Sequence, residues 1–415
     1  MPNLKRFSVE GHRGFARAAM PTFTNVNNAS IVTGVPPSVH GISGNFFFDP
    51  STGEEVMMNS AKFLRCDTIF PAAARVGRKV AVVTAKEKLR DILAAGLIGA
   101  PKRRSGATAA RPQQGSTETH GSNNSNAERT DSAAAARMAA LHGIAFSSER
   151  ANQAKKVTHG IDDVEEIVGH PMPPIYSADA SLYVLKAGVA LLEREMADFL
   201  YLSTTDYMQH KFAPDAPEVI EFYAQIDQEL GRLRELGAII GLTADHGMNA
   251  KQKADGTPNV IHLESLLAKK FGPGFRVILP ITDPYVVHHG ALGSFAVVHL
   301  PPKQALEPVR DWLMDLSGVT EVHDHATAAR KLELPADRVG ELVVLSGRDV
   351  VLGRTPDYHD LKALEGGLRS HGGRYEEMVP FIVSEPLRPE YAAKAAADPR
   401  NFDIFDFALN GIKTE

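Results

Sequence analysis

Two pairs of acidic and histidine residues each follow a short apolar run that is typical of a buried strand. Asp206 and His210 lie four residues apart, so a helical turn here would place both side chains on one face, where they could bind one cation. Asp245 and His246 are adjacent, and both can reach a metal ion if the backbone turns after the strand. Each pair also has a purely structural interpretation, because such residues at strand ends are often caps or turn residues.

Glycines accompany the second pair and a third candidate ligand. Gly247 would permit the turn that brings Asp245 and His246 to one ion, while the glycines after His371 would let a ligand approach the backbone closely. Carboxylate and imidazole ligands without thiolate suit zinc in a catalytic site rather than in a structural one. The three segments in this order therefore predict a catalytic zinc site.

A candidate nucleophile lies upstream, in the segment from Pro21 to Asn45. Thr24 falls at the start of an expected helix, where the helix dipole and a bound zinc ion would both lower the pKa of its hydroxyl. The alternative interpretation is that Thr24 is only the N-cap of that helix.

Short apolar, β-branched runs and longer helical patterns predict the elements that position these residues. Strands are expected at residues 80–84, 144–147, 199–204, 239–243 and 379–383, and helices at residues 177–196 and 217–236. Strands that alternate with helices favour an α/β fold, with a mostly parallel sheet between helices. Ligands of such sheets bind beyond the carboxyl ends of the strands, where the candidate metal ligands fall.

Composition excludes several classes of protein. The 415 residues carry a net charge of −5, so no basic field favours nucleic acid. The single cysteine, Cys66, excludes an internal disulfide and a cysteine-based zinc site. No apolar run has the length of a signal peptide or a membrane helix, so we expect a cytoplasmic protein without a membrane partner.

Two segments differ in composition from the rest. Residues 101–137 are rich in small and polar residues and almost lack large apolar ones, which predicts a disordered insertion. Residues 250–367 are richer in proline and glycine, and they are expected to form a cap subdomain. Residues 1–249 and 368–415 would then form the core.

The stretch MPTFTNVNNASIVTGVPPSVHGISGN, followed by DxxxH, DHG and HGG in that order, resembles the nucleotide pyrophosphatase/phosphodiesterase branch of the alkaline phosphatase superfamily. Within that branch, VVTAKEKLRDIL, YLSTTDYMQHKFAPDAPE and LRSHGGRYEEMVPFIV are similar to the phosphonoacetate hydrolases. The resemblance covers nearly the whole chain except residues 101–137. It implies an alkaline-phosphatase-like fold and a hydrolase that cleaves the carbon–phosphorus bond of a small phosphonate. A homodimer is one assembly that it allows.

The resemblance also implies two zinc ions. One ion would be held by Asp206, His210 and His371, and the other by Asp245, His246 and Thr24. Thr24 would attack phosphorus and form a phospho-threonine, which activated water would then hydrolyse. Asn45 would donate a hydrogen bond to a phosphoryl oxygen as charge develops there.

Two lysines are implied to bind the substrate carboxylate. Lys86 and Lys88 follow the strand expected at residues 80–84, on the ligand edge of the sheet. In phosphonoacetate hydrolases such lysines hold the carboxylate, whereas the alternative is two solvated lysines at the start of a helix. His289 could line the pocket from the cap or serve a structural role.

One feature of the family has no counterpart here. The family begins with a buried strand whose last aspartate binds the second zinc, but this sequence opens at Met1 with a helix-like segment and has no aspartate before Asp49. We therefore expect a missing core strand and a second site that lacks one carboxylate. Either the true start lies upstream of Met1, or this product is truncated. Two alternatives stay open: a phosphodiesterase or nucleotide pyrophosphatase with the same ligands, and a non-catalytic remnant that binds one metal ion.

Overall fold

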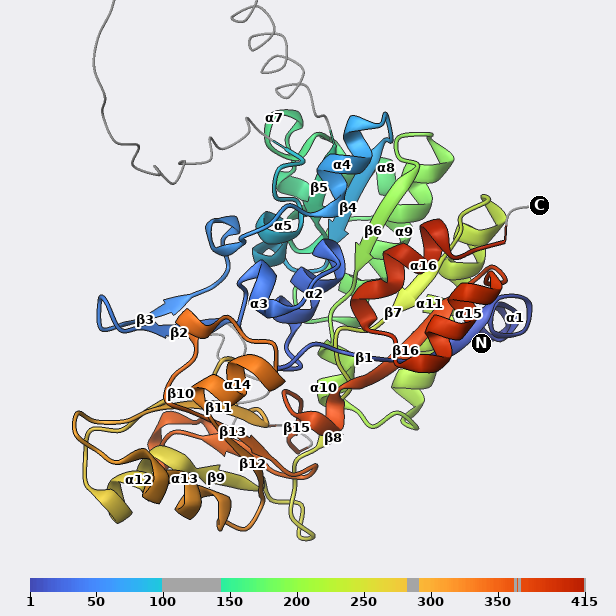
Figure 1. Cartoon of the computed structure of the whole chain (residues 1–415). Helices are drawn as coiled ribbons and strands as arrows, with labels where there is room; N and C mark the ends of the chain where they lie inside the picture. Colours follow the sequence, from blue (N-terminus) through green and yellow to red (C-terminus); the bar gives the residue numbers. More distant parts are fainter. Residues whose placement is uncertain (99–142, 282–290, 362–363, 365–366, 414–415) are drawn as a thin grey trace, which may run out of the picture.

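The structure is a computed structural model that describes residues 1–98, 143–281, 291–361, 364 and 367–413. The insertion expected at residues 101–137 and His289 both lie outside the described residues. Figure 1 shows a larger lobe of helices and strands, and a smaller lobe at its lower left that is built mainly from residues after β8 (Asn249–Ala250).

The larger lobe contains the helices and strands that the apolar patterns predict. Its helices are α1 (Pro2–Glu10), α2 (Thr24–Thr33), α3 (Pro37–His40), α4 (Ile69–Arg75), α5 (Glu87–Leu93), α7 (Lys156–His159), α8 (Val164–Val168), α9 (Ala178–Glu193), α10 (Tyr207–Lys211), α11 (Pro217–Glu235), α15 (Pro389–Ala397) and α16 (Ile404–Asn410). Its main strands are β1 (His12–Arg17), β4 (Val80–Thr84), β5 (Ile144–Ser147), β6 (Phe199–Ser203), β7 (Gly241–Thr243) and β16 (Met378–Val383). None of the described helices is both long and apolar enough to cross a membrane.

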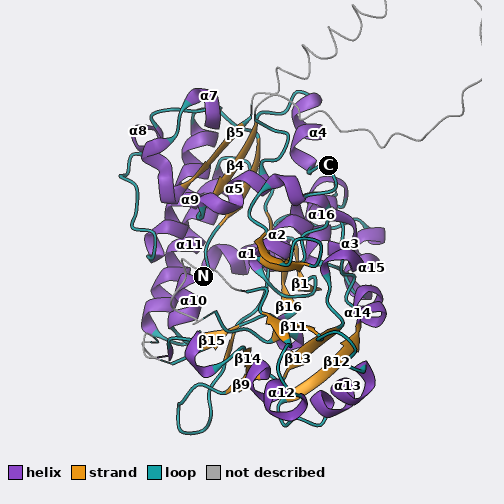
Figure 2. Cartoon of the chain, turned by 90° about the vertical axis from the view of Figure 1, so that its left-hand side faces the viewer, coloured by secondary structure: helices purple, strands orange, loops and turns teal. Residues whose placement is uncertain are grey.

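Helices cover both faces of the parallel half of the sheet. β4 pairs in parallel with β5 on one side and with β6 on the other. Val80 and Val82 of β4 pack against side chains of α2, α4 and α5, whereas Ala81 and Val83 pack against α9 on the opposite face. Figure 2 shows α9 and α4 on opposite sides of these strands. This arrangement confirms the predicted α/β class.

The other half of the sheet is antiparallel. β16 lies between β1 and β7 and runs antiparallel to both, so the expected strand at residues 379–383 does not extend the parallel order. The chain returns from the small lobe at the ligand edge of the sheet, and it therefore enters β16 in the reverse direction.

The two halves meet at β6 and β7 without hydrogen-bonded strand pairing. Within the described chain, each of these strands has a strand neighbour on one side only. Leu202 of β6 and Leu242 of β7 pack against the same apolar cluster, which includes Leu230 and Leu233 of α11. Side-chain packing therefore holds the halves together at this boundary.

The small lobe has its own antiparallel sheet in the order β10-β11-β13-β12. Its elements are β9 (Val260–His262), α12 (Leu263–Phe271), β10 (Arg276–Ile278), β11 (Phe295–His299), α13 (Leu306–Met314), β12 (Val319–Asp324), α14 (His325–Lys331), β13 (Leu342–Ser346) and β14 (Val351–Gly353). The hairpin of β2 (Phe46–Asp49) and β3 (Glu54–Met57) lies beside this lobe, while β8 (Asn249–Ala250) pairs with β15 (Arg369–Ser370) where the chain enters and leaves it. Phe23, directly before Thr24, belongs to the buried cluster of this lobe.

Candidate metal centre

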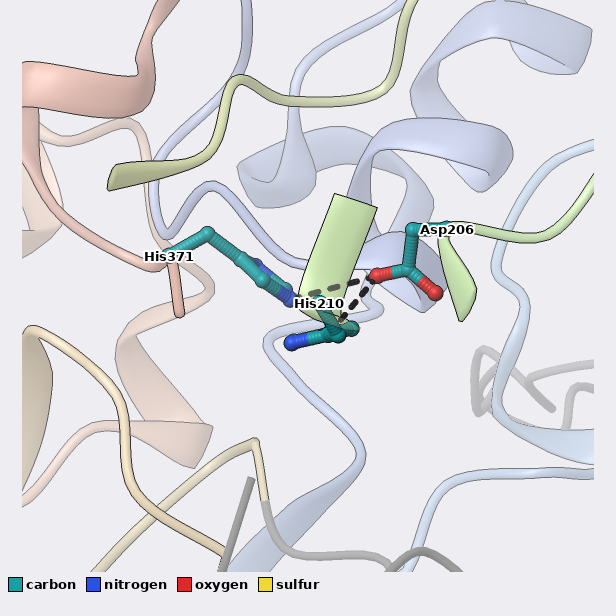
Figure 3. Close-up of side chains that lie close together, drawn as sticks. All are labelled: Asp206, His210 and His371. Atoms are coloured by element: carbon teal, nitrogen blue, oxygen red, sulfur yellow. Dashed lines mark ion pairs between the residues drawn. The ribbon is translucent and has the colours of Figure 1, made fainter. Parts of the chain in front are cut away.

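Asp206, His210 and His371 lie together at the carboxyl end of the sheet. One ligand atom from each lies within 4.8 Å of the other two, and Figure 3 shows the imidazoles directed toward the carboxylate. Asp206 is the N-cap residue of α10, which follows β6, and His210 lies one helical turn later. The four-residue spacing therefore places both side chains on one face, as expected.

Backbone carbonyl groups fix the tautomers of the histidines. Each imidazole Nδ1 lies within hydrogen-bond distance of a carbonyl oxygen: His210 of Arg369 O at 2.8 Å, His246 of Gly247 O at 2.9 Å and His371 of Thr22 O at 2.7 Å. A carbonyl oxygen only accepts, so each Nδ1 carries the proton and each neutral ring presents an Nε2 lone pair. Such outer hydrogen bonds are typical of histidines that bind metals.

The three Nε2 atoms converge on one carboxylate oxygen. They lie 3.0 Å, 3.7 Å and 3.6 Å from Asp206 Oδ2 in His210, His246 and His371 respectively. Lone pairs facing a carboxylate repel it unless a cation lies among them or the rings take up protons. The donor set therefore fits a metal ion such as zinc, which binds imidazole nitrogen and carboxylate oxygen.

The electrostatics of the centre favour an ionised Asp206 and a neutral His371. Burial would raise the pKa of Asp206, but His210, His246 and His371 outweigh it and hold that pKa well below its usual range. Burial, reinforced by His246 and His210, lowers the pKa of His371 well below the usual histidine value. Near neutral pH Asp206 is therefore ionised and His371 is neutral, so both can bind a cation without first losing a proton.

The second group of predicted ligands adjoins the first. The hydroxyl of Thr24 lies 3.3 Å from His246 Nε2, and Asp245 Oδ2 lies 3.5 Å from the same atom. The rings of His246 and His371 stack with centroids 3.5 Å apart and planes 6° apart. The structure thus brings together all six predicted metal-binding residues. His246, a member of the second group, also faces the Asp206 carboxylate of the first group.

Local backbone contacts explain how Thr24 and His371 come together. The Thr22 hydroxyl accepts from Gly372 N at 3.0 Å and donates to Gly373 O at 3.1 Å. Gly372 has a φ of +120°, and a Cβ there would lie 2.4 Å from the ring of Phe23, so glycine is required. The expected role of Gly247 is wrong, because its φ is not positive and a Cβ there would make only ordinary contact.

Asn45 lies at the boundary with the small lobe. Its side-chain amide donates to Ile281 O at 3.3 Å, and its backbone N–H donates to Pro280 O at 2.7 Å. No hydrogen bond joins the Asn45 side chain to the other predicted site residues within the described part of the chain. Its predicted contact with a phosphoryl oxygen stays a prediction.

The predicted lysines occupy the start of α5. Lys86 is the N-cap residue of this helix, and its ammonium lies 4.6 Å from the ring centroid of Tyr176. The Tyr176 ring in turn lies 6.1 Å from that of Tyr207, which follows Asp206. Lys86 is therefore linked to α10 through two aromatic rings, whereas Lys88 lies within α5 and is partly buried.

His40 joins the helix that carries Thr24 to the loop that carries Asn45. Its Nδ1 accepts from Ile42 N at 3.0 Å, so its Nε2 carries the proton and donates to the Ser30 hydroxyl at 2.8 Å. The side chain is fully buried, and burial lowers its pKa to about 3. The ring therefore stays neutral in the folded chain over the ordinary pH range.

This neutral histidine predicts a dependence of stability on pH. The folded pKa is below the unfolded value of 6.5, so the unfolded chain alone takes up a proton at His40 as pH falls from 6.5 toward 3. The free energy of unfolding should fall in this window, by up to about 1.4 kcal/mol per pH unit from this group. His40→Asn, whose amide can still accept from Ile42, should remove that part of the slope in urea titrations with a chelator present. An unchanged slope would contradict the assignment.

The comparisons with known proteins agree with this fold. Residues 1–373 match the type I phosphodiesterase / nucleotide pyrophosphatase family, and the chain belongs to that family. It is 44% identical to phosphonoacetate hydrolase from Sinorhizobium meliloti 1021, over 99% of this chain and 90% of the other. The TM-scores are 0.84 for the complex with phosphonoformate and 0.83 for the complex with phosphonoacetate.

A more distant match concerns the fold alone. Human ectonucleotide pyrophosphatase / phosphodiesterase 5 is 15% identical, with a TM-score of 0.58 over 100% of this chain and 91% of the other. Together the matches confirm the predicted fold class and the resemblance to phosphonoacetate hydrolases.

Thr22 contacts His371 and Tyr176 contacts Lys86, but their sequence patterns do not single them out. A threonine before a helix and an isolated tyrosine are too common to indicate a site. The contact of Thr22 with His371 spans 349 residues of sequence, so no local pattern reveals it.

Proposed function

We propose that the chain hydrolyses phosphonoacetate to acetate and phosphate, with two bound zinc ions. The observation that carries the proposal is the convergence of His210, His246 and His371 on Asp206, in a chain 44% identical to a phosphonoacetate hydrolase. Asp206, His210 and His371 would hold one zinc ion, and Asp245, His246 and Thr24 the other. When bound, the metal ions would lower the pKa of the attacking hydroxyl and neutralise the phosphoryl oxygens.

Thr24 is the proposed nucleophile. Its oxygen forms a bond to phosphorus as the carbon–phosphorus bond breaks, and the departing carbon takes a proton from water to give acetate. The hydroxide left by that water takes up the proton of the threonine hydroxyl. Water then cleaves the phospho-threonine, which releases phosphate and restores the hydroxyl. The position of Thr24 at the first turn of α2 supports this role, because the helix N-terminus stabilises developing negative charge.

The small lobe is proposed to act as a cap, with residues 250–367 as its extent and residues 1–249 and 368–415 as the core. Pro280 and Ile281 of that segment contact Asn45, which links the cap to the residue proposed to stabilise the phosphoryl oxygen.

The direct test is phosphate release from phosphonoacetate by the purified chain, with and without added Zn²⁺. Release that exceeds the uncatalysed rate and that a chelator abolishes would support the proposal. Absence of release at full zinc occupancy would contradict it. One tightly bound zinc per chain without turnover would instead favour the non-catalytic remnant.

Lys86 and Lys88 are proposed to bind the carboxylate of the substrate. Hydrogen bonds to charged groups contribute about 1.5–3 kcal/mol each, so Lys86→Ala with Lys88→Ala should lower kcat/KM for phosphonoacetate by about 100-fold or more. Hydrolysis of an aryl phosphodiester, which has no carboxylate, should change little. The comparison also tests whether the chain is instead a phosphodiesterase.

The matched control replaces two exposed lysines near α7, Lys155→Ala with Lys156→Ala. This change removes the same charge and should leave both activities unaltered. If the Lys86 and Lys88 variant lost phosphonoacetate and phosphodiester hydrolysis equally, these lysines would not be the groups that bind the substrate carboxylate.

A further inference from the structure

The side-chain amide of Asn28 lies where three segments of the candidate centre meet. Asn28 is buried on α2, one turn after Thr24. Its Nδ2 donates to Thr24 O at 3.0 Å and to Asp245 Oδ2 at 3.3 Å. Both acceptors are oxygens that cannot donate a hydrogen bond, so the amide nitrogen of Asn28, and not its oxygen, must face them.

The opposite side of the amide faces β6. The hydroxyls of Tyr201 and Ser203 donate to Asn28 Oδ1 at 2.8 Å and 3.0 Å. Burial and the nearby Asp245 raise the pKa of Tyr201, so its hydroxyl stays protonated and remains a donor. Both N–H groups and both acceptor positions of the amide are therefore used, and it cannot rotate without losing bonds.

We infer that Asn28 is a positioning residue that orients the Asp245 carboxylate relative to Thr24 and to β6. β6 leads into Asp206, so one amide sets the spacing between the segments that carry Asp206, Asp245 and Thr24. The inference rests on the proposed second zinc site, and nothing in the sequence assigns a role to Asn28. Outer hydrogen bonds of this kind typically change metal affinity by about 10- to 100-fold.

The test is Asn28→Asp, which keeps the shape of the side chain but replaces both N–H donors with an acceptor beside Asp245. Zinc affinities are measured by competition with a chromophoric chelator, without substrate. We expect the site that Asp245→Asn also weakens to lose about 10- to 100-fold in affinity. The site that depends on Asp206 should stay within about twofold of its original affinity.

Tyr201→Phe is the milder second variant. It removes one donor to Asn28 Oδ1 and leaves both Nδ2 bonds in place, so it should weaken the same site by a few-fold, in a chain that still unfolds cooperatively. Unchanged affinities in both variants would overturn the inference. So would equal weakening of both sites, which indicates a merely structural role.

The wild-type chain separates this inference from the proposed function. Binding of a single zinc ion by the wild-type chain would also overturn the role of Asn28, because no second ion would need positioning. Phosphate release from phosphonoacetate is assayed separately, and it tests the proposed hydrolysis independently of the result of the zinc titration.

Discussion

Replacement of Thr24 by alanine should lower the rate of phosphate release from phosphonoacetate by on the order of 10⁴-fold or more, because removal of a catalytic nucleophile typically costs that much. The hydroxyl lies 3.3 Å from His246 Nε2 and opens α2, and the helix itself should be little affected by the change. Thr24→Ala should therefore still fold and still bind zinc through Asp206, His210 and His371. Single-turnover and steady-state phosphate assays measure the loss.

Thr33→Ala provides the matched control on the same helix. Thr33 lies at the last turn of α2, where its hydroxyl donates to Ala29 O at 2.7 Å, away from the candidate metal centre. This change should alter stability by about 1 kcal/mol or less and leave turnover unaltered. Retention of activity in Thr24→Ala would exclude the phospho-threonine route.

Replacement of Asp206 by asparagine should have the second large effect. The carboxylate is the group on which three imidazole Nε2 atoms converge, so its loss removes the negative charge that holds a divalent cation. We expect zinc affinity at this site to fall by at least about 100-fold, and turnover to fall by about 1,000-fold at limiting zinc. Zinc content after gel filtration and phosphate release are the two measurements.

The control for this change is Asp179→Asn, which removes an exposed carboxylate in the first turn of α9. It should keep its zinc and its activity. Two zinc ions bound at full affinity by Asp206→Asn would show that Asp206 is not a ligand, whatever the activity.

The sequence predicts the parallel half of the sheet well, because its signals are local. β4 and β5 are continuous apolar runs whose side chains are fully buried. The spacing of Asp206 and His210 likewise predicts their common face, since only one helical turn separates them.

The remaining features depend on contacts between distant parts of the chain. β16 is a clear apolar run, but its antiparallel direction depends on where the chain re-enters the sheet after the small lobe. The carbonyl that fixes the tautomer of His210 belongs to Arg369, 159 residues away. The hydrogen bond from Asn45 to Ile281 crosses the boundary between lobes, 236 residues apart. No local spacing encodes such pairs.

The boundary between β6 and β7 has a consequence for how the molecule responds to metal. Asp206 and His210 follow β6, whereas Asp245, His246 and His371 belong to the segments around β7 and β16. A bound cation would therefore cross-link two half-sheets that are otherwise joined here by side chains alone. We therefore expect the two half-sheets to open independently in the metal-free chain, and metal binding to make them unfold together as one cooperative unit.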